Sequence, residues 1–93
     1  MKHGEYKVPG GKLVIVDFNV DGGQIRDMQI NGDFFLEPAD ALEALNTALE
    51  GVNITAGEAE LTLLLEQAIP AGAELIGFSP AGIATAVRRA LDE

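Results

Sequence analysis

The first third of the chain contains two glycine pairs, Gly10-Gly11 and Gly22-Gly23, and each separates runs with strand-like alternation. Apolar side chains recur at every second position in residues 12–20, and the alternation returns after residue 24. A period of two is typical of a strand with one buried face, and glycine supplies the positive φ angles of tight turns. This pattern predicts three antiparallel strands, the first of them short, between residues 5 and 36.

The turn at residues 21–23 allows two pairings of the second and third strands. A two-residue loop at Gly22-Gly23 would set apolar positions of one strand opposite polar positions of the other. A three-residue loop pairs apolar with apolar positions, for example Val16 with Met28, and commonly uses a glycine at positive φ. We therefore predict the three-residue loop, with a third strand that continues through Gly32 to Leu36.

Three helical patterns follow residue 37, and residues that start or stop helices bound them. Pro38 suits the first turn of one helix, which ends near residue 51. Thr55 and Glu58 form a capping box for a second helix, which Pro70 ends, and Ser79 precedes the third. The predicted apolar faces are Leu42, Leu45 and Leu49, then Leu61, Leu64, Leu65 and Ala68, then Ile83, Val87, Ala90 and Leu91.

Strands followed by helices indicate the α+β class. We predict a single domain over residues 1–93, with an antiparallel three-stranded sheet in 5–36 and three helices in 38–91. The link at residues 71–78 is expected to place Leu75, Ile76 and Phe78 in the core. A chain of 93 residues buries enough surface for one modest core.

Composition narrows the functional classes. The chain has no cysteine, which excludes disulfide scaffolds, thiolate metal sites and cysteine catalysis. No apolar run is long enough to span a membrane, and the N-terminal residues lack the apolar segment of a signal peptide. We therefore expect a cytoplasmic protein.

The formal net charge is −9, from 15 acidic and 6 basic residues. Nucleic acids and anionic membrane surfaces would repel such a domain, so neither is expected as a partner. The scattered acidic residues fit either a solvated surface or long-range attraction to a basic partner.

Candidate catalytic residues are sparse. His3 is the single histidine, and it lacks a second residue with which to form a triad. In the predicted register Asp17 faces Asp27, as a repulsive pair or a weak cation site, unless the pairing differs slightly. The Gly10-Gly11-Lys12 segment fits a tight turn, with a phosphate or adenylate contact by Lys12 as the alternative, since phosphate loops usually open a helix rather than a strand. Docking is a better expectation than catalysis.

The outer face of the predicted sheet is unusually apolar. Leu13, Ile15 and Phe35 fall on it, with Tyr6 or Val8 nearby on the first strand. An exposed apolar row usually marks a contact surface. The alternative is that one of the chain's own helices covers this face.

Three segments resemble one known family. They are Lys7-Val8-Pro9-Gly10-Gly11-Lys12-Leu13-Val14, Asn31-Gly32-Asp33-Phe34-Phe35-Leu36 and Glu74-Leu75-Ile76-Gly77-Phe78-Ser79-Pro80. Together they resemble the accessory C-terminal domain of lipoate–protein ligases. The topology is also similar to that of sulfur-transfer and iron–sulfur scaffold proteins, but those proteins need cysteine.

The resemblance implies a concrete role. Because the sequence starts with methionine and stops after this domain, it is similar to a free-standing accessory subunit, without catalytic residues, that forms a heterodimer with a large catalytic subunit. The pair would activate lipoate with ATP to lipoyl-adenylate and then modify lipoyl acceptor domains. ATP, Mg²⁺ and lipoate would bind to the large subunit, and no cofactor to this chain alone. The residues expected to contact the partner or ligand are Tyr6, Lys7, Gly10, Gly11, Lys12, Leu13, Ile15, Asp33 and Phe35. The alternative is a stand-alone acidic interaction or scaffold module.

Overall fold

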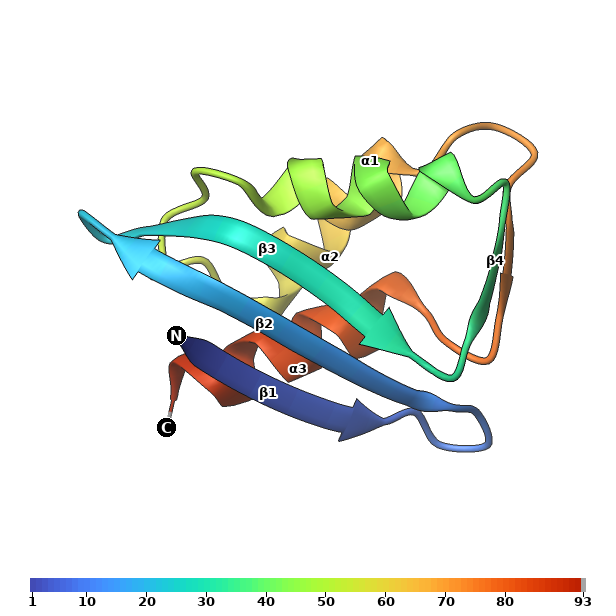
Figure 1. Cartoon of the computed structure of the whole chain (residues 1–93), viewed down its shortest axis with the longest axis horizontal. Coiled ribbons are helices and arrows are strands. Elements are labelled where there is room, and N and C mark those ends of the chain that lie inside the picture. Colours follow the sequence, from blue (N-terminus) through green and yellow to red (C-terminus); the bar gives the residue numbers. More distant parts are fainter. Residues whose placement is uncertain (93) are drawn as a thin grey trace.

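A computed structural model describes residues 1–92. The chain folds into a three-stranded antiparallel sheet whose one face is covered by three helices, with a small two-stranded ribbon at one end (Figure 1). The elements are β1 (Lys2–Lys7), β2 (Leu13–Asp21), β3 (Gln24–Gly32), β4 (Phe35–Glu37), α1 (Asp40–Leu49), α2 (Glu58–Ala68), β5 (Glu74–Ile76) and α3 (Pro80–Leu91). The predicted α+β class, with three main strands and three helices, is confirmed.

The loop between β2 and β3 differs from the prediction. It has two residues, Gly22 and Gly23, whose φ angles are 61° and 77°, as a two-residue hairpin turn requires. The register then shifts between Asp17 and Asn19, where β3 carries an additional residue. Asp27, at φ 56°, lies within this bulge, and a bulge inserts one residue into a strand.

The bulge explains why the three-residue loop was a wrong prediction. Because of the extra residue, odd-numbered side chains of β3 face the core before the bulge and even-numbered ones face it after the bulge. Ile25, Met28 and Ile30 are therefore all buried. Apolar positions therefore meet on one face despite the short loop. The bulge also places Asp17 opposite Gln29, so Asp17 and Asp27 do not face each other, and the alternative of a slightly different pairing is confirmed.

The third strand ends earlier than predicted. β3 stops at Gly32, which has φ 154° and where a Cβ would overlap the carbonyl oxygen of Leu13. The chain turns there, and Phe35 begins β4, which pairs with β5 instead of extending β3. The Phe34 side chain turns inward and stacks on Phe78, with ring centroids 4.1 Å apart.

The helix boundaries follow the sequence signals with two exceptions. The prediction that Pro38 starts the first helix is wrong, because α1 begins at Asp40 and Ala39 is its N-cap residue. Ser79 caps α3, since its Oγ accepts a hydrogen bond from the Gly82 amide at 3.1 Å, as predicted. The capping box at Thr55 is wrong, because the Thr55 hydroxyl donates to the Asn53 side chain and Gly57 precedes α2 without a side-chain cap. The Glu58 carboxylate instead accepts a hydrogen bond from the Thr85 hydroxyl on α3.

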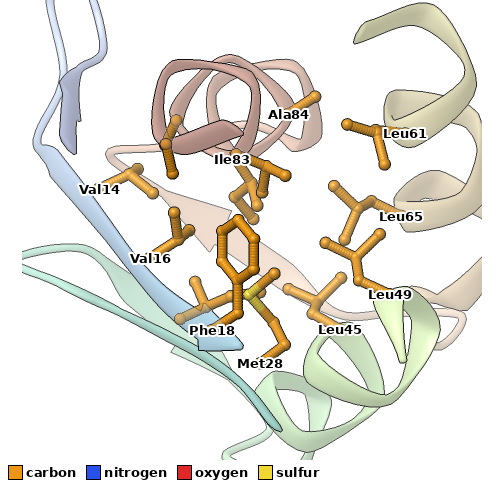
Figure 2. Close-up of a cluster of buried hydrophobic side chains, with 14 of the residues drawn as sticks. Val14, Val16, Phe18, Met28, Leu45, Leu49, Leu61, Leu65, Ile83 and Ala84 are labelled. Atoms are coloured by element: carbon orange, nitrogen blue, oxygen red, sulfur yellow. The ribbon is translucent and has the colours of Figure 1, made fainter. Parts of the chain in front are cut away.

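The core lies between the sheet and the helices (Figure 2). Side chains from β2 and β3 meet those of all three helices, and most are fully buried. The large buried residues are Val14, Val16, Phe18, Ile25, Met28, Ile30, Leu45, Leu49, Leu61, Leu65, Ile83 and Val87. Leu75 and Phe78 join this core as predicted, but Ile76 is 55% exposed, so its predicted burial is wrong.

Candidate functional site

Three corners of the fold meet at the end of the molecule that carries the ribbon (Figure 1). They are the β1–β2 turn, the β3–β4 corner and the segment between β5 and α3. The Lys12 amide donates a hydrogen bond to the Gly77 carbonyl oxygen at 2.7 Å, and the Asp33 amide donates to the Leu13 carbonyl oxygen at 3.3 Å. These bonds bring together segments that lie far apart in the sequence, including Lys12, Leu13 and Asp33 from the predicted set.

The Pro-Gly-Gly-Lys segment forms a closed turn. The Gly11 amide donates to the Val8 carbonyl oxygen at 2.8 Å, and the Val8 amide donates to the Lys12 carbonyl oxygen at 3.0 Å. The Lys7 ammonium group donates to the Gly11 carbonyl oxygen at 3.0 Å, and Gly10 has a φ of 71°. Because the Gly11 and Lys12 amides are used internally, they do not converge on a shared anion as a phosphate-binding loop would. The tight-turn interpretation is therefore favoured.

Gly11 and Gly77 are needed where the turn touches the ribbon end. A Cβ on Gly11 would lie 2.6 Å from the Gly77 carbonyl oxygen, and a Cβ on Gly77 would lie 2.5 Å from Lys12 Cγ. Gly77 also has a φ of 90°, which L-residues with a side chain avoid. This close contact fixes the turn against the end of the ribbon.

The ribbon of β4 and β5 is the most exposed apolar part of this end. Phe35 and Ile76 lie directly opposite each other and are 50% and 55% exposed. A cavity of about 300 Å³ opens beside Phe35, which forms part of its wall. It is lined by Asn31, Gly32, Phe34, Phe35, Leu36, Ala39 and Leu42. Ile76 was missed as a surface residue, because the short segment Glu74-Leu75-Ile76 has no apolar/polar alternation that would indicate a strand with an exposed Ile76.

The outer face of the three-stranded sheet holds fewer of the predicted residues than expected. Leu13 and Ile15 point away from the helices and are partly exposed, so the chain's own helices leave this face uncovered. Tyr6 pairs with buried Val14 and faces α3, where the Arg89 guanidinium lies 4.8 Å from its ring centroid. The placement of Tyr6 in the outer row is therefore wrong. Phe35 belongs to the ribbon and not to this sheet, so it does not continue the row either.

His3 sits on that outer face between two carboxylates. Its Nδ1 lies 2.5 Å from Asp17 Oδ1, and its Nε2 lies 2.7 Å from Glu5 Oε2. The hydrogen bond to Glu5, followed by that to Asp17, raises the pKa of His3 to about 8. Both ring nitrogens are thus engaged in an exposed ion-pair cluster.

Among residues 1–92, no group of three or more histidine, aspartate or glutamate side chains is arranged to hold a metal ion. No helix in the same part of the chain has the length and apolar character needed to cross a membrane.

Comparison with known proteins gives consistent matches. Residues 3–71 match the family model described as bacterial lipoate protein ligase C-terminus. Lipoate-protein ligase A subunit 2 of Thermoplasma acidophilum is 40% identical over 42 residues, which are 45% of this chain and 45% of that protein. The match thus spans less than half of the curated relative.

A solved structure agrees over a longer stretch. It comes from an archaeal lipoylation system of Thermoplasma acidophilum, described as a bi-partite lipoate protein ligase. Its chain is 29% identical, with a TM-score of 0.67 and coverage of 94% of this chain and 91% of that chain. Together with the family match over residues 3–71, this shows that the chain belongs to the family of lipoate–protein ligase C-terminal domains.

Proposed function

We propose that this chain is the non-catalytic accessory subunit of a two-chain lipoate–protein ligase. With a large catalytic subunit it supports the ATP-dependent activation of lipoate to lipoyl-adenylate, before the lipoyl group passes to acceptor domains. The observation that carries the proposal is the family match over residues 3–71. The likeness to a chain of a bi-partite ligase over 94% of this sequence supports it.

The side chains of this molecule suit positioning better than bond making. The imidazole of His3 is held by Glu5 and Asp17, and the Ser79 hydroxyl caps a helix, so neither is arranged as a nucleophile with its base. A rigid surface that orders the loops of another active site lowers a barrier by orienting the reactants. We therefore assign ATP, Mg²⁺ and lipoate to the large subunit.

Lys12 is the basic residue at this end best placed to reach a partner or a nucleotide. The Lys7 ammonium group already donates to the Gly11 carbonyl oxygen, whereas the Lys12 side chain is exposed beside Gly77. The net charge of −9 disfavours binding of a polyphosphate to this chain by itself. A role for Lys12 at the nucleotide therefore requires the large subunit to supply the rest of the site.

The test is an adenylation assay with purified chains. The large catalytic chain is incubated with lipoate, ATP and Mg²⁺, with and without this chain, and pyrophosphate and lipoyl-adenylate are measured. We expect adenylate to form when both chains are present and this chain alone to be inactive. Equal adenylate in the presence and absence of this chain would overturn the proposal.

A second candidate function rests on the uncovered sheet face with Leu13 and Ile15. A stand-alone acidic module would use this face for self-association and would leave lipoylation unchanged. Sedimentation of the isolated chain distinguishes the two, because an accessory subunit is expected to pair with the large chain rather than with itself. The cytoplasmic location remains a prediction from the sequence.

A further inference from the structure

The β4–β5 ribbon carries two different surfaces because its two strands are in register. Opposite residues of an antiparallel pair project from the same face, and successive residues alternate. Leu36 and Leu75 form the inner pair and pack against the core. The outer face holds the Phe35–Ile76 pair and, next to it, the Glu37–Glu74 pair, all of which are exposed.

The apolar pair is unusual among the exposed side chains of residues 1–92. Phe35 and Ile76 are cross-strand neighbours. The other large exposed hydrophobic residues are Met1, which precedes β1, Val20 on β2 and Leu63 on α2. A large apolar side chain that stays in contact with water forgoes the favourable free energy of burial. The adjoining cavity of about 300 Å³, with Phe35 in its wall, leaves room for an apolar side chain of another molecule.

The acidic pair on the outer face favours a partner that brings positive charge. Glu37 and Glu74 lie directly opposite each other, and like charges in this arrangement are destabilising. In the part of the chain that the structure describes, the salt bridges involve other carboxylates, namely Glu5, Asp17 and Asp92. A basic group from outside would therefore find two uncompensated carboxylates beside an apolar contact.

The ribbon is also held in place before any partner arrives. At one end the Gly77 carbonyl oxygen accepts the hydrogen bond of the Lys12 amide. Below it the Phe34 and Phe78 rings stack, and Leu36 and Leu75 anchor the inner face. A surface that is ordered in the free protein loses little conformational entropy on binding.

We infer that the outer face of the β4–β5 ribbon is the anchor by which this chain docks on the large catalytic subunit. The complementary surface presents an apolar side chain that packs on Phe35 and Ile76, flanked by a lysine or arginine that pairs with Glu37 and Glu74. This inference rests on the proposed function, since it names the partner that the accessory role requires. Four residues cannot form a whole interface, but a few buried side chains usually supply most of the binding energy.

The test compares the affinities of variants for the large subunit. The chain is immobilised through its N-terminus, which lies at the end of the sheet away from the ribbon (Figure 1). The double variant Phe35→Ala/Ile76→Thr is expected to bind at least about thirtyfold more weakly. Leu63→Thr on α2 is the matched control, because Leu63 is 53% exposed and lies outside the ribbon, and it should bind normally.

Replacing Glu37 and Glu74 should affect stability and binding differently, which a purely structural role of the two residues would not produce. Glu37→Gln/Glu74→Gln removes the repulsion, so the Tm of the free chain should stay the same or rise. Binding to the large subunit should nevertheless weaken about three- to tenfold and become less dependent on salt. Unchanged affinity in this variant, or an equal loss in Leu63→Thr, would overturn the inference.

The outcomes separate this inference from the function on which it rests. If the wild-type chain binds the large subunit and supports adenylation while the ribbon variants bind equally well, only the ribbon inference fails. If the wild-type chain neither binds nor affects adenylation, the accessory function fails as well. If the isolated chain dimerises and Phe35→Ala/Ile76→Thr makes it monomeric, the occupant of the ribbon is a second copy and the inference is wrong.

Discussion

Asp27 carries the backbone conformation on which the packing of β3 depends. It has a φ of 56°, and the Asn19 side chain donates a hydrogen bond to its carboxylate at 3.1 Å. The left-handed region costs a residue with a side chain roughly 1–2 kcal/mol, and aspartate and asparagine tolerate it best. The residue type at position 27 therefore affects the free energy of forming the bulge that places Met28 and Ile30 in the core.

Replacing Asp27 with valine tests this role. Because a β-branched side chain disfavours positive φ, Asp27→Val should lower the free energy of unfolding by about 1–2 kcal/mol, measured by denaturant titration. Asp27→Asn is the matched control and should change the stability much less. Equal stability of the valine and asparagine variants would show that the bulge imposes no such constraint.

His3 gives the molecule a pH-dependent group on its open sheet face. Its pKa is raised from 6.5 to about 8, chiefly by Glu5 and then by Asp17, so the folded state binds this proton more tightly than the unfolded state does. The stabilisation is fully present below about pH 6.5 and is lost as the pH rises through about 8. Since the imidazole is exposed, salt will weaken the effect.

An NMR titration of the imidazole checks this directly. We expect a midpoint near pH 8 at low salt, and Glu5→Gln should lower it more than Asp17→Asn does. A wild-type midpoint close to the ordinary value of 6.5 would contradict the hydrogen-bonded arrangement of His3. The Tm difference between wild type and His3→Ala should likewise be larger at pH 6 than at pH 9.

At the scale of elements, the contact between β1 and α3 depends on a glycine. A Cβ on Gly4 would overlap the Ala86 carbonyl oxygen and lie 2.9 Å from the Ala90 Cβ. Both neighbours belong to the helix, and a backbone atom cannot move aside without shifting α3. The small side chains on this face of the helix thus let it approach the edge strand closely.

We expect Gly4→Ala to lower the free energy of unfolding by about 1–3 kcal/mol, the usual cost of overpacking. Gly57→Ala is the control, because nothing lies within 4 Å of its Cβ position and it has a φ of −80°. Its effect should be below about 1 kcal/mol, as for a change between glycine and alanine at a helix start. If both substitutions cost the same in denaturant titrations, the close approach of α3 is not limiting.

The elements that sequence patterns predicted well are those whose local signals suffice. The period of two in β2, the leucine faces of α1 and α2, and the Ser79 cap of α3 each depend on neighbouring residues alone. The predicted pairing of β2 with β3 was wrong because two arrangements satisfy the same apolar alternation. One is a three-residue loop, and the other is a two-residue loop followed by a bulge at Asp27. The ribbon was missed because Phe35 and Ile76 become neighbours only through pairing between distant segments, which depends on the tertiary fold.

In the candidate site, too, local features could be predicted from the sequence, whereas contacts between distant segments could not. The Gly10-Gly11 turn could be recognised from its residues, and the motif resemblance drew attention to Lys12, Asp33 and Phe35. The contacts that bring them together, from the Lys12 amide to the Gly77 carbonyl oxygen and from the Asp33 amide to the Leu13 carbonyl oxygen, join segments that are remote in the sequence. Tyr6 was misplaced because the pairing of Tyr6 with Val14, which turns it toward α3, could not be read from the short first strand.

For the molecule as a whole, the layout fits a subunit that completes another protein. The helices cover one face of the sheet, the ribbon stands at one end, and the N-terminus lies at the opposite end (Figure 1). The net charge of −9 would favour encounter with a basic surface and make the association rate fall with ionic strength. The proposed accessory role therefore predicts that the large chain carries a basic docking surface.

The accessory role is tested most directly by titrating this chain into a fixed amount of the large catalytic chain while lipoyl-adenylate formation is measured. We expect the rate to rise with added chain and to saturate at one equivalent. A rate that is already maximal without this chain, and stays constant as it is added, would show that this chain is not an accessory subunit.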